Sequence, residues 1–112
     1  MHSNFDNSLE LSSDCRKITA KGPLTWDPGD AEHCRIKVTI TQGNLVGHGD
    51  TGNYNKGDTW WECDVKVDGG GPWQVADALA HGDLEMSGPP APRPWPDQTV
   101  SLQPQAAAVP QP

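Results

Sequence analysis

Two runs of alternating apolar and polar residues constrain the fold of this chain more than any other feature. The first covers residues 35–41 (RIKVTIT) and the second residues 59–67 (TWWECDVKV). A period of two is typical of β-strands that bury one face and expose the other to water. The residues on the expected buried faces are Cys34, Ile36, Val38 and Ile40 in the first strand, and Trp61, Cys63, Val65 and Val67 in the second. The pattern predicts a small antiparallel β domain with one core.

Shorter alternating runs and frequent turn sequences extend this pattern along the chain. Residues 27–30 (DPGD) and 42–44 (QGN) are turn sequences, and residues 49–58 (GDTGNYNKGD) are all turn formers, which predicts a loop. Short strands separated by turns about every 8–12 residues are typical of β-sandwiches. We therefore expect an all-β fold, a small antiparallel β-sandwich with an immunoglobulin-like or fibronectin-III-like architecture. A small barrel is the alternative.

Residues 72–84 fit two structures. Pro72 suits the first position of a helix, and Val75, Ala76, Leu79 and Ala80 would share one helical face, which favours a short helix over 72–81. The same residues also alternate as a strand. We favour the strand because every neighbouring element is predicted to be β.

The predicted domain covers residues 9–102. Residues 1–8 are expected to form a flexible N-terminus, and the Pro/Gln/Ala-rich residues 103–112 a disordered tail. Residues 89–93 (PPAPR) contain a P-x-x-P sequence that suits an SH3-like groove, but we interpret it as a stiff connection between strands.

Charge excludes some partners. The net charge is −7 with only eight Lys and Arg, so nucleic acid and anionic membranes are expected to be repelled. No stretch approaches the roughly 20 apolar residues that insertion into a membrane requires. The chain as given begins with no recognisable signal peptide, so the sequence predicts no compartment by itself.

The pairing of the cysteines would indicate the cellular compartment of the chain. Cys34 and Cys63 share the buried parity, so they form either a disulfide or two buried thiols, and a disulfide would place the chain outside the cytoplasm. Cys15 has no obvious partner, and the alternative pairings join it to Cys34 or to Cys63. No C-x-x-C spacing that would suggest a zinc ribbon or redox site occurs.

Two His-Gly-Asp tripeptides are candidates for a metal site. If His48 and Asp50 met His81 and Asp83 in the fold, two imidazoles and two carboxylates would suit zinc or another divalent ion. The competing interpretation is that both tripeptides begin turns. No cofactor-binding motif is present, and the loop over 50–58 lacks the spacing of an EF-hand.

Five tryptophans against one Phe and one Tyr form an unusual aromatic composition. Trp60 is predicted to face water, and Trp26 and Trp73 are expected at loop edges, so these three are candidates for ligand binding. No catalytic motif is present, which favours a non-enzymatic role. We expect a recognition or structural module that presents loops and Trp to a protein partner. The alternatives are a carbohydrate-binding module that stacks sugars on Trp, and a metal-binding protein or metalloenzyme built on the His-Gly-Asp tripeptides.

Overall fold

The computed structural model describes residues 2–26, 28–29, 32–69, 71–86, 95 and 97–104. These residues form β-strands and no helix, so the expected all-β fold is confirmed. The strands are β1 (His2–Ser3), β2 (Ser8–Leu11), β3 (Lys17–Thr25), β4 (His33–Gln42), β5 (Leu45–Asn55), β6 (Trp60–Val67), β7 (Asp77–Met86) and β8 (Gln98–Pro104).

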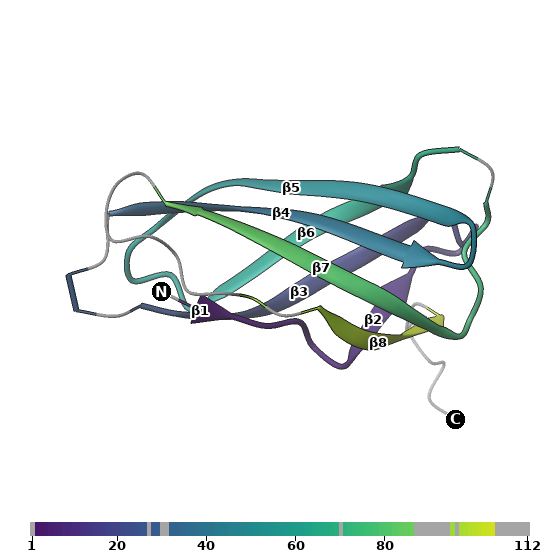
Figure 1. Cartoon of the computed structure of the whole chain (residues 1–112), viewed down its shortest axis with the longest axis horizontal. Coiled ribbons are helices and arrows are strands. Elements are labelled where there is room, and N and C mark those ends of the chain that lie inside the picture. Colours follow the sequence, from purple (N-terminus) through teal and green to yellow (C-terminus); the bar gives the residue numbers. More distant parts are fainter. Residues whose placement is uncertain are drawn as a thin grey trace, which may run out of the picture.

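The strands close on one another. They pair in the order β1-β3-β2-β8-β7-β4-β5-β6, and β6 also pairs with β3, so β2 to β8 form one barrel-like sheet (Figure 1). The sheet is mixed, because β2 and β8 run parallel while the other neighbours run antiparallel. The predicted sandwich is not confirmed, since two seams join what would be the edges of separate sheets. These seams are the β2–β8 pairing and the short β5–β6 pairing.

The two alternating runs behave as predicted. Ile36, Val38 and Ile40 of β4 are buried, and so are Trp61 and Val65 of β6. The intervening residues of both strands point outward, and β5, β4 and β7 lie side by side on the front of the molecule in Figure 1. Period-two alternation therefore predicts the buried and exposed faces of these strands correctly.

One end of the barrel is filled by aromatic rings. The ring centroid of Phe5 lies 5.5 Å from that of Trp61 and 4.8 Å from that of Trp95, and the two Trp rings are 5.8 Å apart. The Nε1 atom of Trp61 donates a hydrogen bond to Ser3 Oγ at 2.8 Å. The segment expected as a flexible N-terminus thus supplies strand β1 and a core residue, Phe5, which is 3% exposed.

The loop prediction for residues 49–58 is largely wrong. Strand β5 continues to Asn55, and it pairs with β4 along its length, with an irregularity between Arg35 and Lys37. Long-range pairing with β4 overrides the weak strand propensity of this glycine-rich stretch.

The helix alternative over 72–81 is also wrong. Residues 77–86 form β7, which lies between β4 and β8 and buries Ala78 and Ala80. The P-x-x-P sequence at 89–92 and the tail from 105 to 112 lie outside the described residues.

Candidate functional site on the outer face of the sheet

The outward-facing residues of β5, β4, β7 and β8 form rows across the barrel. Val46 lies opposite Thr41, Thr41 opposite Leu79, and Leu79 opposite Thr99. These four residues are named the apolar row. The side chains of Val46 and Leu79 remain 37% and 44% exposed, although both belong to regular strands. Val46 and Leu79 lie on either side of Thr41, so two exposed aliphatic side chains occupy the same face of the sheet.

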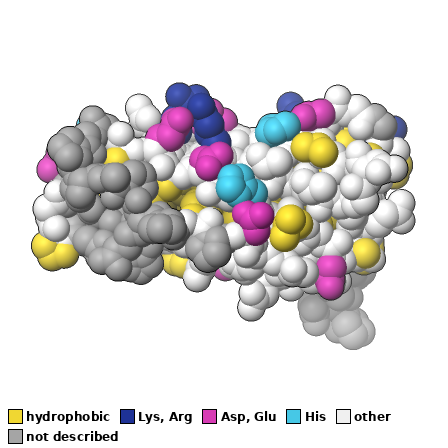
Figure 2. Space-filling model, in the orientation of Figure 1, with side chains coloured by type: hydrophobic (Ala, Val, Ile, Leu, Met, Phe, Trp, Pro, Cys, Tyr) yellow, Lys and Arg dark blue, Asp and Glu magenta, His cyan; other side chains and the backbone are white. Residues whose placement is uncertain are grey.

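The next row contains two histidines. His48 of β5 and His81 of β7 both lie opposite Thr39 of β4, one on each side of it. These three residues are named the histidine row. Figure 2 shows histidine, acidic and hydrophobic side chains close together on this face of the molecule.

Aspartates hold both rings of the histidine row. Nδ1 of His48 lies 2.5 Å from Oδ2 of Asp68. Nδ1 of His81 lies 2.6 Å from Oδ1 of Asp97, and its Nε2 lies 3.1 Å from Oδ1 of Asp83. The hydrogen bond to Asp97 raises the pKa of His81 above the ordinary 6.5, and the charge of Asp83 acts in the same direction. These carboxylates favour the positively charged ring of His81.

The glycines of the His-Gly-Asp tripeptides have a packing role. Both tripeptides lie within strands, not at turns, so His and Asp point outward while Gly points inward. A Cβ atom at Gly49 would lie 2.5 Å from the backbone oxygen of Asp64, and one at Gly82 would lie 2.5 Å from the ring of Trp95. The barrel interior has no room for a side chain at either position.

The structure places the four candidate metal ligands on one face without bringing them together. Strand β4 separates His48 and Asp50 from His81 and Asp83, which corresponds to two strand spacings, about 9.6 Å. No group of three or more His, Cys, Asp or Glu side chains suited to a metal occurs among the described residues. Both ring nitrogens of His81 already contact carboxylates. The geometry therefore gives the metal hypothesis no support.

Charged residues continue the same face beyond the histidine row. Arg35 and Asp50 form a two-point ion pair in which Arg35 Nε donates to Asp50 Oδ1 at 2.8 Å. This hydrogen bonding lowers the pKa of Asp50 to about 2. Lys37 lies 3.3 Å from Glu85. The cations of this face thus have acidic partners within the face.

The three candidate tryptophans lie in different surroundings. Trp60 is 45% exposed on the outer side of β6, opposite Pro23, as the alternation predicts. Trp73 is only 2% exposed and packs beside Gly47, so the expectation that it presents an open ring is wrong. Trp26 packs against the core, and its Nε1 donates to the backbone oxygen of Asp58 at 2.7 Å. Burial of Trp73 removes this ring from any exposed surface on which a sugar could stack.

The cysteines are free thiols. Cys34 on β4 and Cys63 on β6 are buried, as their parity predicts, and β5 lies between their strands, so of the two alternatives the structure shows buried thiols and not a disulfide. Burial raises the pKa of Cys63 to about 12, and the nearby charge of Asp64 adds to the shift. Cys63 is therefore a neutral core residue with little reactivity.

Sequence reasoning missed the apolar row. The alternation in β4 places Thr39 and Thr41 on the exposed side, which is a usable signal. It does not say which residues of β5 and β7 stand beside them, because strand register depends on contacts distant in sequence.

No family model and no curated protein matches the sequence. Within the described ranges, no helix has the length and apolar character needed to cross a membrane.

Proposed function

We propose that this protein is a non-enzymatic recognition module that binds a protein partner through the outer face of β5, β4, β7 and β8. The partner presents apolar side chains bordered by Lys and Arg. The observation that carries the proposal is the apolar row, in which Val46 and Leu79 flank Thr41 and stay exposed. The fold does not need aliphatic side chains at outward positions, and an interface gives them a use.

Carboxylates border the apolar row and support the choice of a basic partner. The backbone N–H of Asp68 donates to the Val46 carbonyl at 2.8 Å, which places Asp68 at one end of the row. Asp77 lies two residues before Leu79 on the same side of β7, and Asp97 bonds to His81 beside it. Complementary charge would steer a basic partner to this face and would make the association rate fall with added salt.

The strand order supports a finer assignment of the fold. Starting from β2, one side of the barrel runs β2-β3-β6 and the other runs β8-β7-β4-β5. In an immunoglobulin-like domain the corresponding order is A-B-E on one side and G-F-C-C′ on the other. We propose an immunoglobulin-like module whose two sheets are joined at their edges, with the candidate face on the second side.

The experiment is a peptide selection on the immobilised protein. A displayed library is selected on the wild-type chain, and the affinity of enriched peptides is measured for Val46→Thr/Leu79→Thr. Threonine suits an exposed strand position, so this double variant keeps the fold, which circular dichroism checks. Trp60→Thr is the matched control, because it removes an exposed hydrophobic side chain from a different face.

We expect enriched peptides to combine apolar residues with Lys or Arg. The double variant should bind them at least about tenfold more weakly, a loss of about 1.4 kcal/mol, and Trp60→Thr should bind as the wild type does. Equal binding by the double variant, or loss of binding only in Trp60→Thr, would refute the proposed face. A selection that enriches no peptide dependent on Val46 and Leu79 would also count against it.

A further inference from the structure

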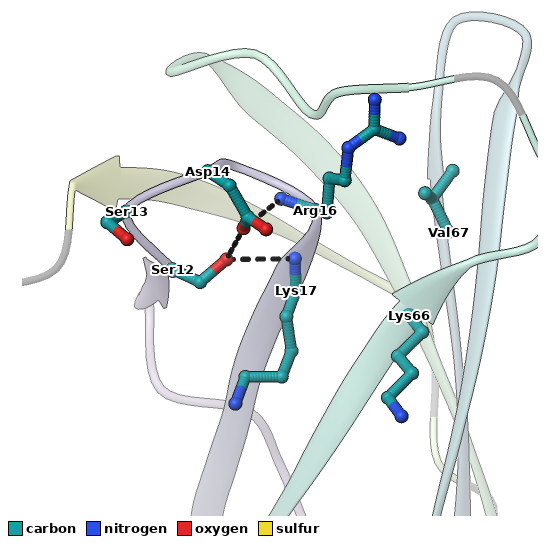
Figure 3. A pocket seen from close by; sticks show the side chains of 7 residues that line it. All are labelled: Ser12, Ser13, Asp14, Arg16, Lys17, Lys66 and Val67. Atoms are coloured by element: carbon teal, nitrogen blue, oxygen red, sulfur yellow. Dashed lines mark hydrogen bonds between the residues drawn. The ribbon is translucent and has the colours of Figure 1, made fainter.

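A hollow of about 490 Å³ lies beside the turn between β2 and β3 (Figure 3). Its walls come from turn residues 12–14, 16 and 17 and from Lys66 and Val67 at the end of β6. Arg16, Lys17 and Lys66 thus all line one hollow, in a chain that has only eight basic residues and a net charge of −7. This hollow shares no residue with the face proposed for the protein partner.

Hydrogen bonds fix the turn that forms one wall. Ser12 Oγ donates to Asp14 Oδ1 at 2.5 Å, and the backbone N–H of Lys17 donates to Ser12 Oγ at 3.1 Å. The backbone N–H of Arg16 donates to the same Asp14 oxygen at 3.1 Å. These donors, the Ser12 hydroxyl first, lower the pKa of Asp14 and keep its carboxylate engaged within the turn. The hydroxyl of Ser13 has no hydrogen-bond partner in the described part of the chain.

Two lysines face each other across the strands that border the hollow. Lys17 of β3 and Lys66 of β6 are direct register partners, an arrangement in which like charges repel. In Figure 3 their side chains extend in the same direction, while that of Arg16 points the other way. Lys17 lies 3.7 Å from Asp64 in an exposed pair, which is a weak competitor for another anion. Lys66 has no carboxylate partner among the described residues.

We infer that this hollow is an anion-binding site in which the ammonium groups of Lys17 and Lys66 hold a phosphate or sulfate group. A compact dianion relieves the repulsion between the two lysines and forms charge-assisted hydrogen bonds with both. The Ser13 hydroxyl is a further donor on the rim, and Arg16 adds to the positive field from the other side. The fixed turn holds Lys17 in place before the anion arrives.

The test is an NMR titration with inorganic phosphate at constant ionic strength, using sodium chloride as the reference. Amide shifts of Ser13, Lys17 and Lys66 should follow a saturating curve in phosphate only. Lys66→Gln should weaken the affinity about fivefold or more, because one unit charge beside the anion is lost. Lys21→Gln is the matched control. It removes the same charge from the same face of β3, but Lys21 lies opposite Glu62 and outside the hollow.

Stability without phosphate provides a second readout. Lys66→Gln removes a repulsion and should raise Tm by about 1–4 °C at low salt, whereas Lys21→Gln removes an attraction and should lower it. The titration is then repeated with sulfate and with O-phosphoserine to distinguish a free anion from a phosphate ester. Tighter binding of O-phosphoserine than of inorganic phosphate would identify the ester as the ligand. Shifts that stay linear and match those in chloride would overturn the inference, as would unchanged affinity in Lys66→Gln.

Discussion

Replacing Gly82 by alanine tests whether the glycines of the His-Gly-Asp tripeptides serve packing. The added Cβ would lie 2.5–2.6 Å from three atoms of the Trp95 ring, so the ring must retreat by about 1 Å to reach ordinary contact. Trp95 packs against Phe5 and Trp61, and its displacement disturbs both neighbours. Overpacking of this kind costs about 1–3 kcal/mol. We expect Tm to fall by about 4–8 °C for each kcal/mol lost.

A double-mutant cycle isolates the cause. In a Trp95→Ala background the obstacle is gone, so Gly82→Ala should cost at least about 1 kcal/mol less than it does in the wild type. Gly49→Ala is the comparator, because its Cβ would strike the backbone oxygen of Asp64 at 2.5 Å, and Trp95 cannot relieve that contact. The free energy of unfolding is measured in urea by circular dichroism. A cost for Gly82→Ala that is the same with and without Trp95 would refute the packing explanation.

Three further predictions concern the barrel. The raised pKa of His81 means that its charged ring stabilises the fold fully below the ordinary pKa of 6.5, and that this contribution is lost as pH rises through the folded pKa. His81→Gln should flatten the decline in Tm above pH 6.5, and an unchanged pH profile would contradict this assignment. Tyr54→Phe removes the hydroxyl that accepts a hydrogen bond from the Glu62 N–H at 3.0 Å and donates one to the Glu62 carbonyl. The substitution should lower the free energy of unfolding by about 1 kcal/mol and speed hydrogen exchange at the Glu62 amide. Unaltered exchange would show that the hydroxyl does not close the β5–β6 seam. All cysteines should react with a thiol reagent in denaturant without prior reduction. In the native chain Cys63 should stay unreacted. A number of reactive thiols that rises only after reduction would reveal a disulfide.

Local pattern predicts the strands that carry continuous alternation and fails where glycine interrupts it. The faces of β4 and β6 follow from period two, down to the outward Trp60 beside the inward Trp61. The part of β5 over residues 49–55 does not, because its glycines resemble loop residues in sequence. Gly49 occupies a strand position at which the backbone of β6 leaves no room for a side chain. This crowding is a property of the assembled core and leaves no local trace in the sequence.

The candidate site depends even more on long-range register. The two His-Gly-Asp tripeptides invite a metal hypothesis because the residues have suitable chemistry, yet Thr39 stands between His48 and His81. The loop-edge position of Trp73 likewise suggests an open ring, but the closed barrel buries it. In both cases the residue types are visible in the sequence, while the pairing that separates or covers them forms only in the complete sheet.

Closure of the sheet also bears on the proposed binding of a partner. An open sheet can bind an extended peptide along a free edge through its backbone. Here β2 is joined to β8, and the short β5–β6 pairing is supplemented by the Tyr54 hydroxyl on the backbone of Glu62. If the proposed function holds, binding relies mainly on outward side chains. The histidine row continues through His48 to Lys66, which lies opposite it on β6, so the proposed anion site adjoins the proposed docking face. Since His48 and Lys66 are both exposed, any electrostatic coupling between the docking face and the anion site is weak and screened by salt. Each site can therefore be tested by substitution without removing the other.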